Sequence, residues 1–400
     1  ELIDVAHASD AETPEVPGFV VDFETITLNG TPRAITNLVH VPGTASEFLI
    51  LEKSGGVHHY EVVGTTATLL GSVTVPDVDI TADCGLISAA FDPDFATNGF
   101  VFVGSCISET HSRITRHVFD PSDYGAFATS LVEIITVGDP ASPEPWHSIG
   151  SIGFEPSGVL WALFGEKNLP NEAQDTTNEL GSLVRIVPSR TTGVGGASPA
   201  SDNPFALDAD PTTNANVAAY GLRSPWKGAR DASGRLVIGD VGQSSYEEVS
   251  LFVAGATTPN FGWPMYEGPC AEPCAPPLVA PLVHYTRSPE HPFVVEDPLA
   301  PSTTVRAVWV GAYYEPDAED RYEGRLTNHV LYGDFCAGFM RSFALTDENE
   351  VDAHAMLAHL EGVTGMAKAG DDYLYVTTYG SCSAFPYRPG ALYRIRLADH

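Results

Sequence analysis

Short apolar runs, each bounded by Gly, Asp or Pro, make up most of this chain, whereas stretches with helical periodicity are scarce. One pattern recurs: a strand of small and apolar residues, a turn that carries Gly, Asn or Asp, and a second apolar strand. The pattern begins at six positions, with a looser copy at the first and a longer turn at the fifth: Asn37, Ala89, Ile152, Gly228, Gly311 and Gly365. Each copy predicts a β-hairpin.

Further strand-like sequence, such as GSLVRIVP or ALYRIRL, follows these hairpins and predicts blades of four antiparallel strands. We therefore expect an all-β chain, with residues 18–400 forming one domain, a six-bladed β-propeller. A pair of β-sandwiches is the competing architecture, but it does not explain why one hairpin pattern recurs six times. In a propeller, the inner strands should share a central axis and the two ends of the chain should lie close together.

The composition supports a folded chain and excludes two classes of partner. Hydrophobic residues make up 43% of the 400 residues, and no apolar run approaches the roughly 20 residues of a membrane span. The net charge of −32 repels nucleic acid and anionic membranes. Two explanations of this charge stay open: an adaptation to salty surroundings, where counterions screen self-repulsion, and an acidic secreted protein without such an adaptation.

The six cysteines predict disulfides, since their number is even and no C-x-x-C pair indicates zinc. Six buried thiols are the alternative. Disulfides indicate an oxidising compartment, so we expect a secreted or periplasmic protein, and polar residues 1–17 are typical of a tether left after an export signal is removed. Local proximity and position in the repeat favour the pairs Cys84–Cys106, Cys270–Cys274 and Cys336–Cys382.

His147 and Glu166 stand at the two ends of one predicted hairpin, PWHSIGSIGFEPSGVLWALFGEKN. A hairpin returns its ends to the same edge of a sheet, so the two side chains can approach each other. A carboxylate fixes the tautomer of an imidazole and raises its basicity, which is how a general base is built. The alternative, which this feature alone favours, is a loop histidine beside a solvated glutamate.

The segment from Ala219 to Gly268 combines features that ordinary β-structure does not need. In AYGLRSPW, Arg223 lies beside apolar sequence and needs an anionic partner, either a ligand or a structural ion pair. In GDVGQSSYEEV, Gly242 and Gln243 form a turn whose carbonyl groups can face a hard cation. Three acidic residues follow this turn: Glu247, Glu248 and Glu267. Oxygen-only ligands favour Ca²⁺, and a solvated acidic loop is the alternative.

A set of motifs resembles the soluble quinoprotein sugar dehydrogenases, which are also called the glucose/sorbosone dehydrogenase family. The motifs are CGLISAAFDPDFATNGFVFV, the segment around His147, ELGSLVRI, DNPF, AYGLRSPW, GDVGQSSYEEV, NFGWP and YGDFCAG. The similarity covers nearly the whole chain from about Ile26. The resemblance implies a six-bladed propeller that uses pyrroloquinoline quinone (PQQ) and Ca²⁺ to oxidise aldoses, with an external electron acceptor.

The resemblance also implies roles for individual residues. His147 matches the catalytic base, and Glu166 stands where an aspartate usually orients that base. Arg223 matches the arginine beside the quinone, and the carbonyls of Gly242 and Gln243 match those that hold the cofactor's Ca²⁺. Other positions are assigned as follows: Glu248 and the backbone of Phe261 to a second, structural Ca²⁺, with Glu267 a further metal candidate, and Asp83 and Trp146 to the substrate.

The chain departs from the family where the three carboxylates of the quinone are bound. Ser224 follows the quinone arginine in place of the usual asparagine. Cys336 or Ala337 stands where a lysine is expected. Gly362 and Thr364 stand where an arginine pair is expected, so Ser224 and Thr364 become the cofactor-binding candidates at these places. The visible cations for the carboxylates are Arg223, Lys167 and Arg306, together with bound Ca²⁺.

Two functions therefore stay open. The first is a PQQ- and Ca²⁺-dependent dehydrogenase of sugars or related alcohols, in which His147 takes the hydroxyl proton. The second is a secreted, non-enzymatic propeller that binds a glycan or a protein, because YGDFCAG is similar to the branch that includes hedgehog-interacting protein. A third, a Ca²⁺-dependent lactonase, needs carboxylate or Asn side chains that converge on an axial metal, and the sequence does not show that set.

Overall fold

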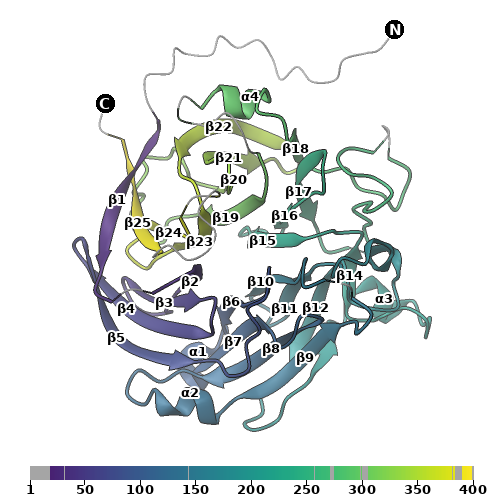
Figure 1. The fold of residues 1–400 in the computed structure, drawn as a ribbon, viewed down its shortest axis with the longest axis horizontal. Coiled ribbons are helices and arrows are strands. Elements are labelled where there is room, and N and C mark those ends of the chain that lie inside the picture. The colour runs from purple at the N-terminus through teal and green to yellow at the C-terminus, as the bar shows by residue number, and fades with distance from the viewer. Residues whose placement is uncertain are drawn as a thin grey trace.

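The computed structural model describes residues 19–30, 32–142, 144–255, 257–270, 274–297, 299, 305–380, 382 and 390–398. Within these residues the chain is almost entirely β, and its strands form sheets arranged as six blades around a central axis (Figure 1). The predicted six-bladed propeller is confirmed. None of the described helices is long and apolar enough to cross a membrane. The expected tether, residues 1–17, lies outside the described residues.

The first three blades follow the order of the chain. Blade 1 contains β2 (Ile35–His40), β3 (Glu47–Glu52), β4 (Gly56–Val63) and β5 (Thr66–Thr74). Blade 2 contains β6 (Leu86–Phe91), β7 (Phe100–Cys106), β8 (His111–Val118) and β9 (Val132–Gly138). Blade 3 contains β10 (Ile149–Phe154), β11 (Leu160–Phe164) and β12 (Ser182–Pro188), and β12 also pairs with β13 (Ala197–Pro199) and β14 (Val217–Tyr220).

The other three blades complete the ring. Blade 4 contains β15 (Pro225–Arg230), β16 (Leu236–Asp240), β17 (Tyr246–Phe252) and β18 (Val283–Thr286). Blade 5 contains β19 (Val308–Tyr314), β20 (His329–Asp334), β21 (Phe339–Leu345) and β22 (Val351–His359). Blade 6 contains β23 (Val363–Lys368), β24 (Leu374–Thr378), β25 (Ala391–Leu397) and β1 (Val21–Leu28). Short helices lie in the connections: α1 (Phe95–Asn98), α2 (Gly125–Thr129), η1 (Pro170–Gln174), α3 (Pro204–Leu207) and α4 (Pro292–Val295).

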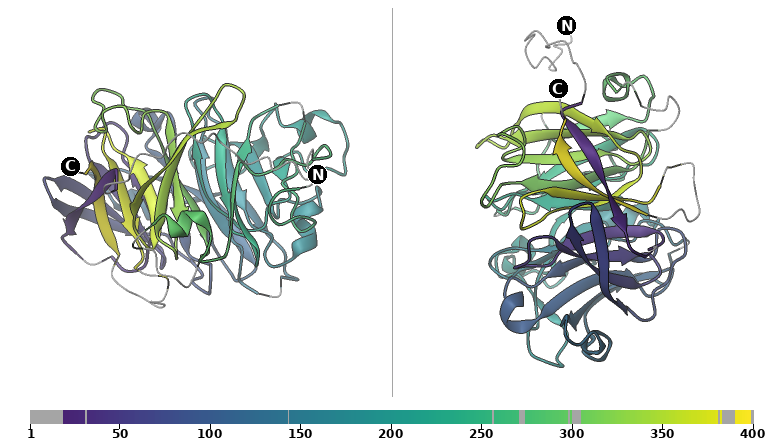
Figure 2. Two further views of the ribbon diagram at one scale, coloured as in Figure 1. Left: turned by 90° about the horizontal axis from the view of Figure 1, so that it is seen from above. Right: turned by 90° about the vertical axis from the view of Figure 1, so that its left-hand side faces the viewer.

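The ring closes through the first and last strands of the described chain. β1 pairs antiparallel with β25, from Val21 opposite Leu397 to Ile26 opposite Leu392. β1 also forms a short parallel pairing with β5, so blades 6 and 1 make one continuous sheet (Figures 1 and 2). The two ends of the propeller therefore lie close together, as expected. Backbone hydrogen bonds of β1 with β25 and with β5 close the ring.

The innermost strand of each blade is the first strand of a predicted hairpin. These strands contact one another around the axis: β2, β6, β10, β15, β19 and β23. In five of the six blades, the pairing of the innermost strand with its neighbour shifts register close to the first residue of the inner strand. Such irregularities occur next to active sites, where they re-aim side chains. The cavity described below lies at this end of the strands.

Apolar side chains pack between neighbouring blades and form the core. Trp309, Leu331 and Met340 of blade 5, for example, pack against Leu374 and Val376 of blade 6. All five are at most 1% exposed. Since burying a side chain of this size contributes about 1.5–3 kcal/mol, the contacts between blades hold the ring at a fixed radius.

Two of the three expected disulfides are present, Cys270–Cys274 and Cys336–Cys382. The third expectation, a Cys84–Cys106 bond, is wrong for this structure, because both residues are buried free thiols. Their proximity was inferred correctly, since the two thiols hydrogen bond to each other. Each also has another partner: the Cys84 thiol donates to the carbonyl of Ser108 at 3.7 Å, and Cys106 lies 3.8 Å from the hydroxyl of Ser112.

Candidate active site

A cavity of about 660 Å³ opens at the end of the ring where the inner strands begin. Every blade contributes to its wall at the start of its inner strand: Thr36, Ile87, Ile149, Pro225, Ala307 and Thr364. The cavity is therefore produced by closure of the ring, since no single blade contains it. Its volume is typical of small-molecule sites. Thr364, a cofactor-binding candidate, is buried in this wall and donates its hydroxyl to the carbonyl of Thr377 at 3.3 Å.

The structure brings His147 and Glu166 together at the wall of the cavity. Nδ1 of His147 lies 2.5 Å from Oε1 of Glu166, whose side chain is buried. Because this contact occupies Nδ1, Nε2 is the atom left to act as a base, and it has no hydrogen-bond partner among the described residues. His147 has a φ of 54°, in the left-handed region. Such strain costs about 1–3 kcal/mol and concentrates at functional sites.

Asp83 and Trp146 line the cavity next to His147. Oδ2 of Asp83 accepts a hydrogen bond from the backbone N–H of His147 at 3.1 Å, and its carbonyl accepts from the hydroxyl of Ser148 at 3.2 Å. The Trp146 side chain is 43% exposed, which gives the cavity an apolar surface beside the histidine. Both substrate-binding candidates therefore lie where they could contact a molecule bound at His147.

Hydrogen bonds from its backbone and from its side chain fix Arg223 at the wall of the cavity. The N–H groups of Arg223 and Ser224 donate to the two carboxylate oxygens of Asp240, at 2.9 and 2.7 Å. Nη1 of Arg223 donates to the carbonyls of Val241 and Gly242, at 2.9 and 2.7 Å. Burial lowers the pKa of Arg223 and raises that of Asp240 to about 7. In the described part of the chain no carboxylate forms an ion pair with the Arg223 side chain, so its charge is available to a ligand.

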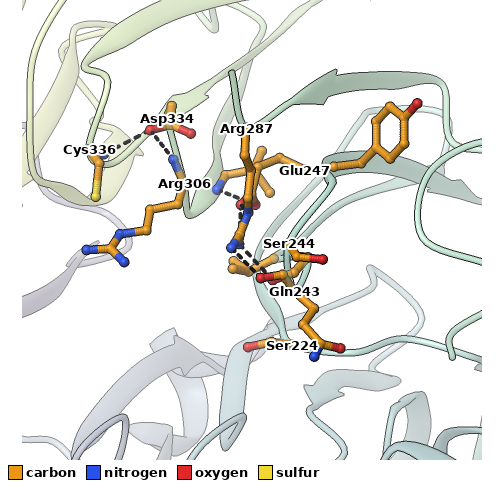
Figure 3. A network of polar contacts seen from close by, with 12 residues as sticks. Ser224, Gln243, Ser244, Glu247, Arg287, Arg306, Asp334 and Cys336 are labelled. Carbon is orange, nitrogen blue, oxygen red and sulfur yellow. Dashed lines mark hydrogen bonds and ion pairs between the residues drawn. The ribbon is translucent and has the colours of Figure 1, made fainter. Parts of the chain in front are cut away.

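A second arginine, Arg287, binds the same turn (Figure 3). Its Nη2 donates to the Gly242 carbonyl and its Nη1 to the Gln243 carbonyl, both at 2.7 Å. Its Nε donates to Oε1 of the buried Glu247 at 2.7 Å. Gly242 and Gln243 line the cavity, but their carbonyl oxygens face guanidinium groups. The two oxygens predicted to bind Ca²⁺ thus already have cationic partners.

The other predicted calcium ligands are not among the residues that line the cavity. Glu267 accepts hydrogen bonds from the four backbone N–H groups of residues 243–246, and although burial opposes it, these donors lower its pKa. Burial raises the pKa of Glu248 to about 8, and its Oε1 accepts from the N–H of Gly268 at 2.5 Å. Phe261 is buried. Within the described residues, no three His, Cys, Asp or Glu side chains are grouped to hold a metal.

Four cationic side chains line the cavity: Lys53, Arg223, Arg287 and Arg306. The whole chain has only 20 basic residues against 52 acidic ones, so a fifth of its positive charges face one cavity. Figure 3 shows Arg306 extended away from Asp334, and its guanidinium group has no ion-pair or hydrogen-bond partner in the described ranges. A cavity of this charge in so acidic a protein is suited to an anionic ligand.

Lys167 is the cofactor candidate that the structure places elsewhere. It is buried, and its Nζ lies 3.5 Å from the Glu109 carbonyl and 4.0 Å from the Cys84 sulfur. It does not line the cavity. Its backbone is in the left-handed region, with φ of 55°.

Sequence reasoning missed Lys53 and Arg287, and also the aromatic wall formed by Trp226 and Phe335. Lys53 did carry a signal, because the chain has only four lysines. The position of Arg287 next to Glu247 could be inferred only from the strand pairing. Glu247 lies opposite Tyr285 across β17 and β18, which makes Arg287 a diagonal neighbour of Glu247 on the same face.

Two curated proteins are similar to parts of this chain in sequence. The HIPL1 protein of Arabidopsis thaliana is 26% identical over 329 residues, which cover 62% of this chain and 47% of that protein. Quinoprotein glucose dehydrogenase B of Acinetobacter calcoaceticus is 24% identical over 227 residues, 48% of this chain and 43% of that enzyme. The chain thus spans less than half the length of each of these curated relatives.

Solved structures share the fold over almost their whole length. The PQQ-bound aldose sugar dehydrogenase of Streptomyces coelicolor superposes with a TM-score of 0.70 at 19% identity, over 96% of this chain and 100% of that one. The soluble aldose sugar dehydrogenase of Escherichia coli, in its apo form, gives 0.67 at 18% identity, over 94% and 100%. The family model described as glucose/sorbosone dehydrogenase matches residues 36–384. Because that match covers most of the sequence, the chain belongs to the glucose/sorbosone dehydrogenase family.

Proposed function

We propose that this protein is a PQQ-dependent dehydrogenase that oxidises an aldose sugar or a related alcohol. One observation carries the proposal. His147, paired with Glu166, lines the same cavity as four cationic side chains, in a chain of net charge −32. A general base and an anion-binding wall in one cavity of about 660 Å³ are what a quinone cofactor and a neutral substrate require.

The residues of the cavity fit the cofactor, although apart from Arg223 they are not those expected from the family. PQQ has three carboxylates, and burying an unpaired charge costs several kcal/mol. Arg223 and Arg306 have no carboxylate partner among the described residues, and Lys53 and Arg287 add positive charge to the wall. These four side chains would hold the cofactor in place of the lysine and arginine pair that the sequence lacks.

His147 and Glu166 would carry out the proton transfer from the substrate. Nε2 of His147 takes the proton of the substrate hydroxyl as the carbonyl bond forms, and Glu166 stabilises the imidazolium through Nδ1–H. Arg223 supplies fixed positive charge where the cofactor becomes more negative on reduction. When bound, PQQ supplies the two-electron acceptor for the hydride that leaves the substrate carbon, and an external electron acceptor reoxidises it.

Calcium at the Gly242–Gln243 turn is not part of this proposal, because the residues there do not fit it. Ca²⁺ binds oxygen at about 2.3–2.6 Å, and at that distance it would compete with two guanidinium groups for the same oxygens. The second calcium, at Glu248 and the carbonyl of Phe261, stays a prediction. It is supported by the burial of Glu248, which forms no ion pair with a described residue.

We also propose a secreted or periplasmic location, which the two disulfides support because such bonds persist in oxidising compartments. The expected partners are a small sugar or alcohol and an external electron acceptor. The charge of −32 disfavours nucleic acid.

A non-enzymatic propeller that binds a glycan or a protein is the second candidate. Two observations favour it. The match to the HIPL1 protein covers 62% of the chain, against 48% for quinoprotein glucose dehydrogenase B. In addition, Cys336 and Thr364 line the cavity near positions where the family resemblance led us to expect basic residues.

Reconstitution separates the two candidates. The purified chain is mixed with PQQ, freed of excess cofactor and offered a panel of aldoses with a dye as electron acceptor. The dehydrogenase proposal expects a retained quinone absorption band and dye reduction with at least one sugar. Neither retained cofactor nor dye reduction would leave the binding propeller as the better interpretation.

A further inference from the structure

We propose that the guanidinium group of Arg287 stands in for a divalent cation at the Gly242–Gln243 turn, so that this site holds its anionic ligand without Ca²⁺. The identity of that ligand, PQQ, rests on the proposed function, but the central claim concerns only what occupies the turn. The hydrogen bonds of Arg223, Arg287 and Glu247 around the two carbonyls carry the inference. Figure 3 shows Arg287 between Glu247 and Gln243.

Both carbonyl oxygens of the turn already accept hydrogen bonds from charged donors. The Gly242 oxygen accepts from Nη1 of Arg223 and from Nη2 of Arg287, each at 2.7 Å. The Gln243 oxygen accepts from Nη1 of Arg287 at 2.7 Å. A carbonyl oxygen has two lone pairs, so the Gly242 oxygen is saturated. A calcium ion needs the same lone pairs and can enter only by displacing an arginine.

The buried carboxylate of Glu247 fixes Arg287 in this position. Its Nε donates to Oε1 of Glu247 at 2.7 Å, and the Glu247 side chain is 0% exposed. The other oxygen of Glu247 accepts from the N–H of Val308 in blade 5 at 3.1 Å. Displacing Arg287 would leave a buried carboxylate without its cation, which is strongly unfavourable. The buried glutamate therefore holds Arg287 at the turn.

Arg287 also keeps a donor for the ligand. A guanidinium has five N–H groups. Nε uses one on Glu247, Nη2 uses one on the Gly242 carbonyl, and Nη1 uses one on the Gln243 carbonyl, while Nη2 also forms an ion pair with Glu247. One Nη1 N–H remains, and the side chain is 19% exposed where it lines the cavity. The group can thus bind a carboxylate of the ligand while it holds the turn, as a bound cation would.

The first test compares the wild type with a Glu248→Gln variant, which removes the side-chain ligand of the second predicted calcium site. PQQ affinity is measured by fluorescence titration in excess EDTA and in excess Ca²⁺, with Mg²⁺ as the control for weak binding to the acidic surface. We expect the dissociation constant to change by less than about twofold in both proteins. A loss of roughly tenfold or more in EDTA that Ca²⁺ restores in both proteins overturns the proposal.

The matched variant is Arg287→Ala, which frees Oε1 of Glu247, the Gln243 oxygen and one lone pair of the Gly242 oxygen as an oxygen-only set that suits Ca²⁺. Its melting temperature should rise with Ca²⁺ and not with Mg²⁺, whereas the wild type and Arg287→Lys should not respond. All of these proteins carry Glu248→Gln, so they differ only at position 287. The proposal is contradicted if Ca²⁺ raises the melting temperature of the protein with Arg287 as much as that of the protein with Ala at this position.

Two outcomes need separate readouts. If Arg287→Ala does not fold, the double variant Arg287→Ala/Glu247→Gln avoids the unpaired carboxylate. Its PQQ affinity should be roughly tenfold weaker than that of the wild type. Unchanged affinity contradicts the proposal.

If the wild type binds no PQQ in any buffer, the proposed function fails. The melting-temperature series then still decides whether Arg287 or Ca²⁺ occupies the turn.

Discussion

Two parts of the cavity wall, the His147–Glu166 hairpin of blade 3 and the Gly242–Gln243 turn of blade 4, are built in different ways. The histidine and glutamate are 19 residues apart and lie at the two ends of one hairpin. Arg287 is 45 residues from Gly242 and reaches the turn only because β18 pairs with β17. The first arrangement is local and the second depends on strand pairing across a long connection. Local pairing therefore supplies the base, and long-range pairing brings Arg287 to the turn.

The two parts also differ in the kind of charge they carry. The hairpin has a group that can exchange a proton, His147, supported by a buried carboxylate. The turn has fixed positive charge, from Arg223 and Arg287, held by backbone carbonyls. If the proposed function is right, damage to the hairpin should lower turnover and damage to the turn should lower cofactor affinity.

His147→Ala should lower turnover of the reconstituted enzyme by roughly 10²–10⁴-fold, which is the usual contribution of a general base. The cofactor affinity should stay close to that of the wild type, because His147 belongs to the hairpin. Steady-state kinetics with a dye acceptor measure the first quantity, and PQQ titration measures the second. His58→Ala, on β4 and away from the cavity, is the matched control. Equal turnover in His147→Ala and the control would remove His147 from the mechanism.

Glu166→Gln should lower turnover by roughly 10²-fold, because the amide keeps the shape of the side chain but not the charge that stabilises the imidazolium. The exposed Glu144→Gln change, on the neighbouring loop, is the control for the loss of one negative charge. Kinetics at several pH values measure the effect. A full turnover rate in Glu166→Gln would mean that the buried carboxylate only positions the ring.

Arg223→Ala should weaken PQQ binding by roughly 10–100-fold, since a hydrogen bond to a charged group contributes about 1.5–3 kcal/mol. The KM for the sugar should change much less, because Arg223 belongs to the turn. Arg396→Ala, an exposed arginine on β25, is the control. A larger effect on KM than on cofactor affinity would contradict the assignment of the turn to the cofactor.

The free energy of unfolding should fall as the pH rises from about 4 to about 7, by up to about 1.4 kcal/mol per pH unit from Asp334 alone. Burial, with the nearby Glu247 charge, raises the pKa of Asp334 from 3.8 to about 7. The unfolded chain therefore releases this proton at a lower pH than the folded chain, so a rising pH favours unfolding throughout this window.

Asp334→Asn tests the origin of this slope. The asparagine oxygen can still accept from the N–H groups of Arg306, Cys336 and Ala337, but the side chain no longer titrates. Urea unfolding across the window should give a flatter dependence on pH for the variant. Added salt controls for the repulsion between surface charges, which has the same sign. Parallel curves for the two proteins would show that Asp334 does not titrate as described.

Much of the fold could be predicted because its signal is local and repeated. Each hairpin has its own turn residues and its own alternation of apolar and polar positions, and six copies allow few architectures. Proximity within a hairpin was predictable for the same reason, so the sequence indicated that His147 and Glu166 can approach each other, and the structure shows that they are in contact. The thiols of Cys84 and Cys106 show the limit, because proximity along the chain did not decide whether they are bonded or only in contact.

The repeat, the closed ring and the possible approach of His147 to Glu166 could all be inferred from the amino-acid sequence. Which cations face the cavity became clear only once the blades were seen packed together. Lys53, Arg287 and Arg306 come from blades 1, 4 and 5, and their common orientation follows from the ring radius and from strand pairing. Hydrophobic periodicity fixes which face of a strand is buried, but it contains no information on which distant loops meet at the end of the axis, because that depends on the packing of all six blades at once.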